Sequence, residues 1–267
     1  MKNFFTGAGE AQGAFSWQHL TFVTFLMIAW IGLAIWLGLR NKSKDTKTKN
    51  KVLIWAALLI DGFEIFKIII GMAYSENPLN SLANNLPFYL CSIQLITIPV
   101  AAFTKGRIKE AALDFVFIFG MLGAVAGTYG AAQNYGCYPV LSFPNVVSGI
   151  THSISGFAAL YIVVVGMASM KLKNAPISYA ILGFFGVCAY TTNLCLETNY
   201  MFLMRHDGTP YSIFYNMVNG NKVIYPIIVI LTLVVWITIY YAIFYAIRGN
   251  KSNEVQAPVN EESVLVK

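Results

Sequence analysis

Long apolar segments alternate with short polar loops along this chain. Seven such segments of 18 to 25 residues can be distinguished, at 20–39, 52–73, 86–103, 111–131, 148–169, 176–196 and 223–247. At about 1.5 Å per residue, a helix of this length crosses the roughly 30 Å hydrocarbon core of a bilayer. Backbone polar groups in lipid must be satisfied within the segment, so the pattern predicts helices and not open sheet. The expected fold class is an all-α polytopic membrane protein with seven transmembrane helices.

Lysine and arginine occupy alternate loops between these segments. Six basic residues lie in the first loop at 40–51, and more lie at 105–109, at 171–173 and, after the last segment, at 248–251. The second and fourth loops contain no lysine or arginine. Basic loops are retained on the cytoplasmic side of a membrane. We therefore expect an N-terminus outside and a C-terminus inside.

Three regions follow from this pattern. Residues 1–19 form an extracytoplasmic N-terminal segment, and because they lack an apolar core they do not resemble a cleavable signal peptide. Residues 20–247 form the seven-helix transmembrane domain. The polar tail at 248–267 has no apolar periodicity and is predicted to be disordered. The loop at 197–222 mixes aromatic and polar residues, which is typical of a segment at the outer membrane interface.

The composition agrees with a membrane protein. Of the 267 residues, 57% are hydrophobic and 11% are charged, whereas a soluble protein carries about 25% charged residues. The net charge of +6 comes mostly from loops beside the spans, so no nucleic-acid partner is expected. The four cysteines form no CxxC motif and the three histidines are widely separated, so we predict no metal site and no cofactor.

Polar side chains within the apolar segments gather in the half of the membrane predicted to be outer. A charged side chain in hydrocarbon costs about 2.5–3.5 kcal/mol on insertion scales, so a cluster at one depth suggests a functional site. The candidate side chains are His19, Asp61, Glu64, Lys67, Cys91, Gln94, His152, Glu197 and Asn199. They come from five predicted spans or their ends, and we expect them to converge on one outer-leaflet pocket.

Cys91 and His152 form the sharpest candidate pair. Both segments enter from the outside, and the two residues lie at a similar depth. An imidazole that takes the thiol proton produces a thiolate, which attacks ester or thioester carbonyls. Glu64 or Glu197 would orient the imidazole. The alternative interpretation is that Cys91 is an apolar filler and His152 a packing residue.

The remaining candidates would support that pair. Gln94 and Asn199 could donate hydrogen bonds to an oxyanion. Asp61, Glu64 and Lys67 are three residues apart and share one helix face, although Glu64 and Lys67 could simply neutralise each other. His19 lies at the start of the first span, where it is an interfacial or supporting residue.

Glycines are frequent between residues 120 and 136. Small residues at this spacing let helices approach closely, so the stretch is interpreted as helix packing and not as a phosphate-binding loop.

Short motifs resemble a known family. The segment LPFYLCS at 86–92 resembles the signature of the YwaF-type bacterial integral membrane proteins, and SWQHL at 16–20, NYMFL at 199–203 and the region of His152 also fit. That family is related to the transmembrane-protein-164 lipid acyltransferases. The resemblance implies an intramembrane cysteine, here Cys91, that carries an acyl chain between lipids with help from His152. Tyr89 departs from the signature, which often has histidine there.

Two functions are therefore predicted as alternatives. The first is a lipid acyltransferase with a cysteine acyl-enzyme intermediate, whose partners are membrane lipids, with no obvious protein partner. The second is a non-enzymatic protein that binds or transports a small polar or amphipathic solute through an outer-facing cavity. A retinal protein is disfavoured, because the last segment at 223–247 contains no lysine. The expected location is the plasma membrane of a bacterium, since the loops are rich in lysine and asparagine.

Overall fold

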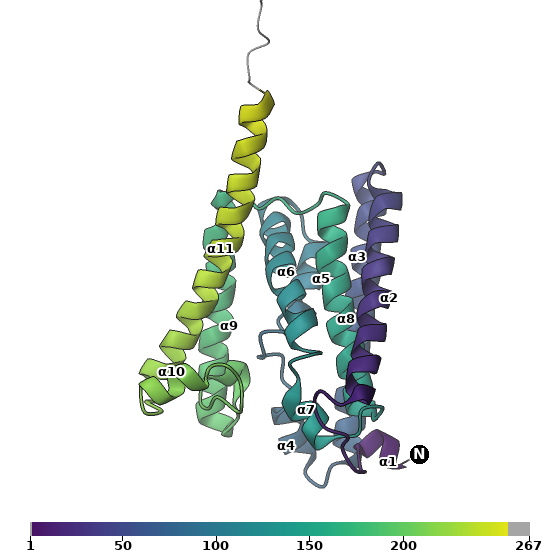
Figure 1. Ribbon diagram of the computed structural model, residues 1–267, viewed down its shortest axis with the longest axis vertical. Helices are drawn as coiled ribbons and strands as arrows, with labels where there is room; N and C mark the ends of the chain where they lie inside the picture. Colours follow the sequence, from purple (N-terminus) through teal and green to yellow (C-terminus); the bar gives the residue numbers. More distant parts are fainter. Residues whose placement is uncertain (1, 256–267) are drawn as a thin grey trace, which may run out of the picture.

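The computed structural model describes residues 2–255 (Figure 1), and in this range it is all-α, as predicted. The elements in chain order are α1 (Lys2–Thr6), α2 (Trp17–Asn41), α3 (Thr46–Tyr74), α4 (Pro78–Ala83), α5 (Gln94–Phe103), α6 (Gly106–Ala126), α7 (Ala132–Cys137), α8 (Phe143–Val164), η1 (Leu172–Asn174), α9 (Ala175–Leu196), η2 (Tyr200–Phe202), α10 (Ser212–Met217) and α11 (Ile224–Val255). The long helices run up and down alternately, and the short helices α1, α4, α7 and α10 lie at the same end of the molecule, with α10 apart from the other three (Figure 1).

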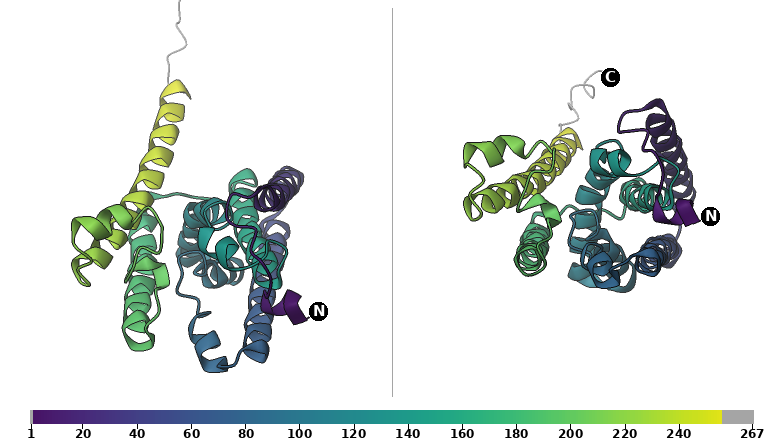
Figure 2. Two further views of the ribbon diagram at one scale, coloured as in Figure 1. Left: turned by 60° about the horizontal axis from the view of Figure 1, so that its bottom comes forward. Right: turned by 90° about the horizontal axis from the view of Figure 1, so that it is seen from below.

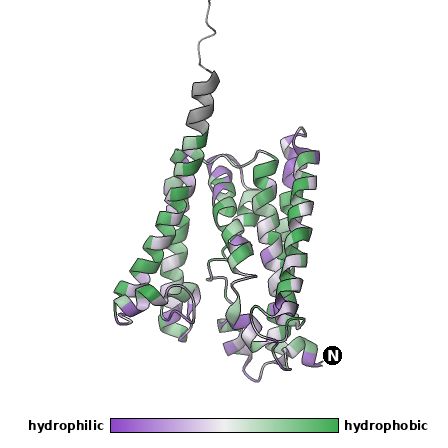
Figure 3. Ribbon diagram, viewed as in Figure 1, coloured by the Kyte–Doolittle hydropathy of each residue, from purple (hydrophilic) through white to green (hydrophobic). Residues whose placement is uncertain are grey.

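Within the described chain, four helical segments are long and apolar enough to cross a membrane. They are Trp17–Asn41, Phe143–Val164, Leu172–Leu196 and Ile224–Ile247. Figure 3 shows hydrophobic residues along the shafts of the long helices, with hydrophilic residues concentrated toward their ends. These four spans mark an integral membrane protein. The other three predicted spans differ, because α3 and α6 carry more charged residues and α5 is short.

The third predicted span is not one continuous helix. Turns occupy residues 84–93, and α5 begins only at Gln94. Pro87 has no amide hydrogen to donate to a helix. The Tyr200 hydroxyl accepts a hydrogen bond from the Leu86 amide, which ties this segment to the chain more than one hundred residues later. Cys91 consequently lies in the turns that precede α5 and not in the middle of a helix.

The C-terminal region also differs from the prediction. α11 continues to Val255, so it includes the first part of the tail at 248–267 that was expected to be disordered. Residues 256–267 lie outside the described chain. The loop at 197–222 contains η2 and α10. Figure 1 shows α10 at the same end of the molecule as α1, α4 and α7.

The long helices form two packed groups that share α6. One buried core lies among α2, α3, α5, α6 and α8. Its buried residues include Trp30, Ala57, Val116 and Phe157. A second core joins α6 to α9 and α11 and includes Leu182. Figures 1 and 2 show α9 and α11 as a pair to one side of the other helices, which they meet mainly through α6.

The loop between α2 and α3 is fixed by a helix cap. Asp45 precedes α3 and accepts hydrogen bonds from the Lys47 and Thr48 amides and from the Thr48 hydroxyl. An acidic N-cap satisfies amides that have no partner within the helix. The hydrogen bond from the Thr48 hydroxyl lowers the pKa of Asp45 below its usual value.

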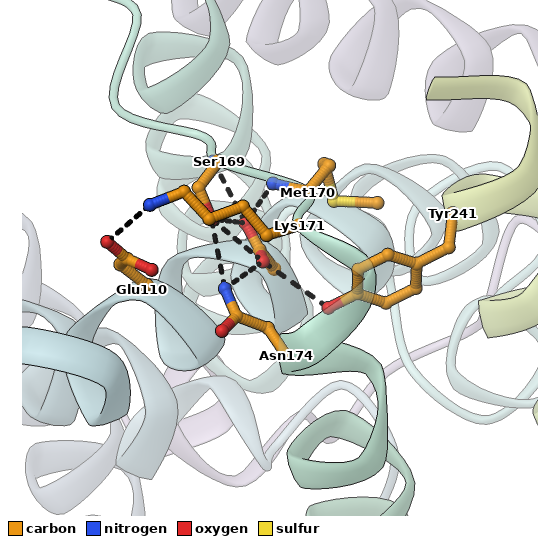
Figure 4. A network of polar contacts seen from close by, with 7 residues as sticks. Glu110, Ser169, Met170, Lys171, Asn174 and Tyr241 are labelled. Carbon is orange, nitrogen blue, oxygen red and sulfur yellow. Dashed lines mark hydrogen bonds and ion pairs between the residues drawn. The ribbon is translucent and has the colours of Figure 1, made fainter. Parts of the chain in front are cut away.

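A buried carboxylate holds the two groups together. Asp114 in α6 is fully buried and accepts hydrogen bonds from the Ser169 and Met170 amides at 3.0 and 2.8 Å. The Asn174 side chain and the Tyr241 hydroxyl of α11 donate to the same carboxylate, at 3.0 and 3.3 Å (Figure 4). Asp114 therefore connects α6 to the loop before α9 and to α11.

Candidate active site

Cys91 and His152 meet in space although they are sixty-one residues apart in the sequence. The half-buried Cys91 thiol and the His152 imidazole interact electrostatically. Both line a small cavity of about 40 Å³. Its walls are Ile60, Glu64, Lys67, Cys91, Ser92, Leu95, Ser148, Thr151, His152 and Ser155. The cavity lies between α3, the start of α5 and α8.

The backbone of α8 sets the orientation of His152. Its Nδ1 atom lies 2.7 Å from the carbonyl oxygen of Ser148, one helical turn earlier. A carbonyl can only accept a hydrogen bond, so Nδ1 carries the proton and Nε2 is left unprotonated. Nε2 is then the nitrogen that can accept the thiol proton of Cys91. The Ser148 carbonyl thus does what was expected of Glu64 or Glu197.

Gly127, the C-cap of α6, makes room for His152. A Cβ atom on Gly127 would lie 1.9 Å from His152 Cδ2 and 2.1 Å from Nε2, distances that no packed structure tolerates. A Cβ atom on Gly123, one turn earlier, would lie 3.6 Å from the Cβ of Cys91, which is ordinary contact. The glycine-rich stretch was interpreted as helix packing alone. At Gly127 it also provides the space that the imidazole occupies.

Glu64 and Lys67 form an ion pair at the cavity wall. The Lys67 Nζ and Glu64 Oε1 atoms are 2.6 Å apart, and the pair is mostly shielded from solvent. The two side chains therefore neutralise each other, as the alternative interpretation stated. Lys67 also interacts electrostatically with Cys91. Asp61 is half-buried one turn earlier on α3 and is not among the residues that line the cavity.

His19 has a structural position away from the cavity. The side chain is fully buried, and its Nδ1 atom accepts a hydrogen bond from the Phe15 amide at 3.0 Å. Nε2 therefore carries the proton and donates to the Thr128 carbonyl, also at 3.0 Å. The imidazole lies against the Tyr135 ring, with ring centroids 3.9 Å apart. With both nitrogens engaged, His19 joins α2 to the end of α6 and does not reach Cys91.

Gln94, Glu197 and Asn199 also lie apart from the cavity-lining residues. Gln94 is fully buried and accepts a hydrogen bond from the Thr97 hydroxyl. Glu197 is exposed at the end of α9, with a left-handed backbone. The Asn199 side chain accepts a hydrogen bond from the Arg205 amide at 3.0 Å, a contact within the loop at 197–222. These contacts within loops and helices explain why the expected five-helix convergence is not what the structure shows.

Tyr89, the residue that departs from the bacterial signature, packs against Tyr200. Its ring packs edge-on against the Tyr200 ring, with centroids 4.8 Å apart, and it does not line the cavity. The tyrosine therefore belongs to the contact between the turns before α5 and the loop at 197–222.

Sequence reasoning overlooked three residues of this site. Ser148 and Ser155 lie four residues before and three after His152, a spacing that places all three on one face of α8. That spacing was visible in the sequence. The role of Gly127 was not, because it depends on how closely α6 and α8 approach.

The fold and the site together define an all-α integral membrane protein with a cysteine and a histidine in contact at a small polar cavity. A sequence model of the TMEM164 family matches residues 14–249. This match covers most of the chain, and the protein belongs to the TMEM164 family. The YwaF-type resemblance has no counterpart in the comparisons. Neither the curated proteins nor the solved structures give a match.

Proposed function

We propose that the protein is a membrane-embedded lipid acyltransferase that works through an acyl-cysteine intermediate. The observation that carries the proposal is that Cys91 and His152 line one small cavity, where the Ser148 carbonyl fixes the tautomer of the histidine. This is the arrangement of a nucleophile, a base and an orienting group. Membership of the TMEM164 family and the four apolar helices support a lipid substrate.

The chemistry would proceed in two half-reactions. His152 Nε2 accepts the thiol proton while the sulfur attacks the ester carbonyl of a glycerolipid. The tetrahedral intermediate then collapses, the carbon–oxygen bond to glycerol breaks, and the imidazolium returns the proton to the leaving alkoxide. A thioester on Cys91 remains. In the second half-reaction the hydroxyl of an acceptor lipid attacks this thioester, and Cys91 regains its proton.

The cavity gives less support to a solute-binding or transport function. Its volume of about 40 Å³ has room for water but not for a metabolite. The Glu64–Lys67 ion pair leaves no unpaired charge there for a polar ligand. An acyltransferase requires only that the ester carbonyl reaches the thiol, while the chains stay in the surrounding lipid.

We further propose that α3, α5 and α6 cross the membrane together with the four apolar helices. The alternating direction of the long helices in Figure 1 supports seven crossings. With the basic loops on the cytoplasmic side, the cavity would lie toward the outer leaflet. The proposed location is the plasma membrane of a bacterial cell. The Glu64–Lys67 pair is then a neutralised pair within the bundle, as intramembrane charges usually are.

The acyl-enzyme is tested by intact-mass spectrometry of purified protein incubated with defined phospholipids. The wild type is expected to gain the mass of one acyl chain less one hydrogen, and Cys91→Ala is expected to gain nothing, because it lacks the accepting sulfur. Cys188→Ala is the matched control, since Cys188 is also half-buried but does not line the cavity. An unmodified wild type, or an adduct that persists in Cys91→Ala, would reject the proposal.

Gly127→Ala is expected to slow acylation of Cys91 by about 10²-fold. The added methyl would overlap the imidazole and displace it, and a shift of about 1 Å at a catalytic group has effects of that size. The measurement is the rate of the mass increase described above. Gly183→Ala is the control, because no atom lies within 4 Å of a Cβ at that glycine. Equal rates in the two variants would show that His152 does not need its observed position.

A further inference from the structure

The Ser155 hydroxyl is buried at the cavity wall without a partner. The residue is 2% exposed, and its Oγ atom has no hydrogen-bond partner within the described chain. It lines the same cavity as Cys91 and His152. A buried polar group that lacks a partner is destabilising, so its presence at a cavity indicates that something else supplies the partner.

The hydroxyls of Ser153, Thr128 and Thr97 are satisfied by backbone carbonyls one turn earlier. Ser153, two residues earlier on α8, donates to the Gly149 carbonyl at 2.7 Å. Thr128 donates to the Ala124 carbonyl at 2.7 Å, and Thr97 bonds the Ile93 carbonyl at 3.2 Å. Bonding to the carbonyl four residues earlier is the usual arrangement for serine and threonine in helices. Ser155 does not adopt it, and its hydroxyl remains available to the cavity.

The surroundings of Ser155 restrict what can bind there. Ser155 follows His152 by three residues and so shares its face of α8. On the other side α6 packs closely, since a Cβ atom on Gly120 would lie 2.9 Å from the Ser155 carbonyl oxygen and 3.4 Å from its Oγ. The cavity of about 40 Å³ has space for one small oxygen-bearing group beside the thiol.

We infer that Ser155 is a catalytic residue that donates a hydrogen bond to the carbonyl oxygen of the ester attacked by Cys91. The inference rests on the proposed acyl transfer. When the sulfur bonds to the carbonyl carbon, the carbonyl π electrons move to the oxygen, which becomes an oxyanion. The Ser155 O–H donates to that oxygen and keeps its own proton. When the intermediate collapses, the carbonyl re-forms and the alkoxide leaves with the proton from His152.

This assignment replaces the two oxyanion donors expected from the sequence. Gln94 and Asn199 do not line the cavity, whereas Ser155 does. A donor placed where negative charge develops stabilises the transition state more than the bound ester, because the carbonyl oxygen of the transition state carries much more negative charge than that of the ester. The effect should therefore appear in the rate of acylation and hardly in substrate affinity.

The test compares acylation with alkylation of Cys91 in the full-length protein. Acylation is followed by the burst of nitrophenolate released from 4-nitrophenyl octanoate, and alkylation by iodoacetamide is followed by intact mass. Alkylation at a saturated carbon forms no oxyanion. Ser155→Ala is expected to slow the acylation burst by about 10²–10³-fold, the loss typical of one oxyanion donor, and to leave alkylation at the wild-type rate. Ser153→Ala, on the same helix, is expected to leave both rates unchanged.

Thermal unfolding provides an independent measurement on the same variants. Because the Ser155 hydroxyl has no partner, Ser155→Ala is expected to unfold at or above the wild-type temperature. If Ser155→Ala unfolds at the wild-type temperature or above and still gives a slower burst, the loss of rate comes from catalysis and not from a damaged fold.

Three results would overturn the inference about Ser155. They differ in whether the acyl-transfer proposal survives. An unchanged burst in Ser155→Ala would refute it and leave the acyl-enzyme intact. Equal losses of acylation and alkylation would show that Ser155 only positions Cys91. A wild-type protein that gives no burst, and gains no acyl mass from phospholipids, would refute the acyl-transfer proposal together with the inference.

Discussion

Replacing His152 by glutamine is expected to slow acylation of Cys91 by about 10²–10⁴-fold, the usual contribution of a general base. Glutamine has a comparable reach but cannot accept the thiol proton. The observed geometry makes the loss specific, because the Ser148 carbonyl holds Nδ1–H and leaves only Nε2 for the thiol. The burst of 4-nitrophenyl octanoate measures the rate.

Alkylation of Cys91 by iodoacetamide at neutral pH should slow in His152→Gln as well, since no base then removes the thiol proton. This distinguishes His152 from Ser155, whose loss should affect acylation alone. The control is His206→Gln, because His206 lies in the loop at 197–222, where its Nδ1 accepts a hydrogen bond from the Gly208 amide. If His152→Gln acylated as fast as His206→Gln, the base would have to be a different residue.

Asp114→Ala is expected to lower the free energy of unfolding by about 3 kcal/mol or more. The substitution leaves the Ser169 and Met170 amides and the Asn174 side chain without their acceptor. An unpaired buried donor costs about 1–3 kcal/mol. The Tyr241 hydroxyl loses a contact too, so the pairing of α11 with α6 should weaken first. Chemical denaturation in detergent, followed by circular dichroism, measures the change.

Glu110→Ala is the control for that experiment. Glu110 lies one turn before Asp114 on α6 and pairs with Lys171 at 2.8 Å, but both side chains are substantially exposed (Figure 4). Exposed ion pairs contribute about 0–1 kcal/mol, so this variant should remain close to the wild type. A similar small loss for Asp114→Ala would mean that the buried carboxylate does not hold the two helix groups together.

Local patterns in the sequence were sufficient to predict an all-α membrane protein and to place Cys91 and His152 at a similar depth. Helices and apolar spans depend on residues close together in the chain, so an all-α membrane protein could be read from periodicity and length. Cys91 and His152 were chosen because polar residues are costly in apolar segments. Their shared depth followed from counting residues along two predicted helices. The same counting failed for the third span, where the turns at 84–93 depend on a distant contact with Tyr200.

What the sequence by itself determined is therefore the class of protein and the residues whose chemistry is costly in lipid. The tertiary structure alone decided which of those residues meet. It separated His19, Gln94 and Asn199 from the cavity. His19 donates to the Thr128 carbonyl beyond α6, the Gln94 side-chain oxygen accepts a hydrogen bond from Thr97, and the Asn199 side chain accepts one from the Arg205 amide. It also showed that Gly127 must lack a side chain. Such facts depend on distances between helices, and no pattern within one helix contains them.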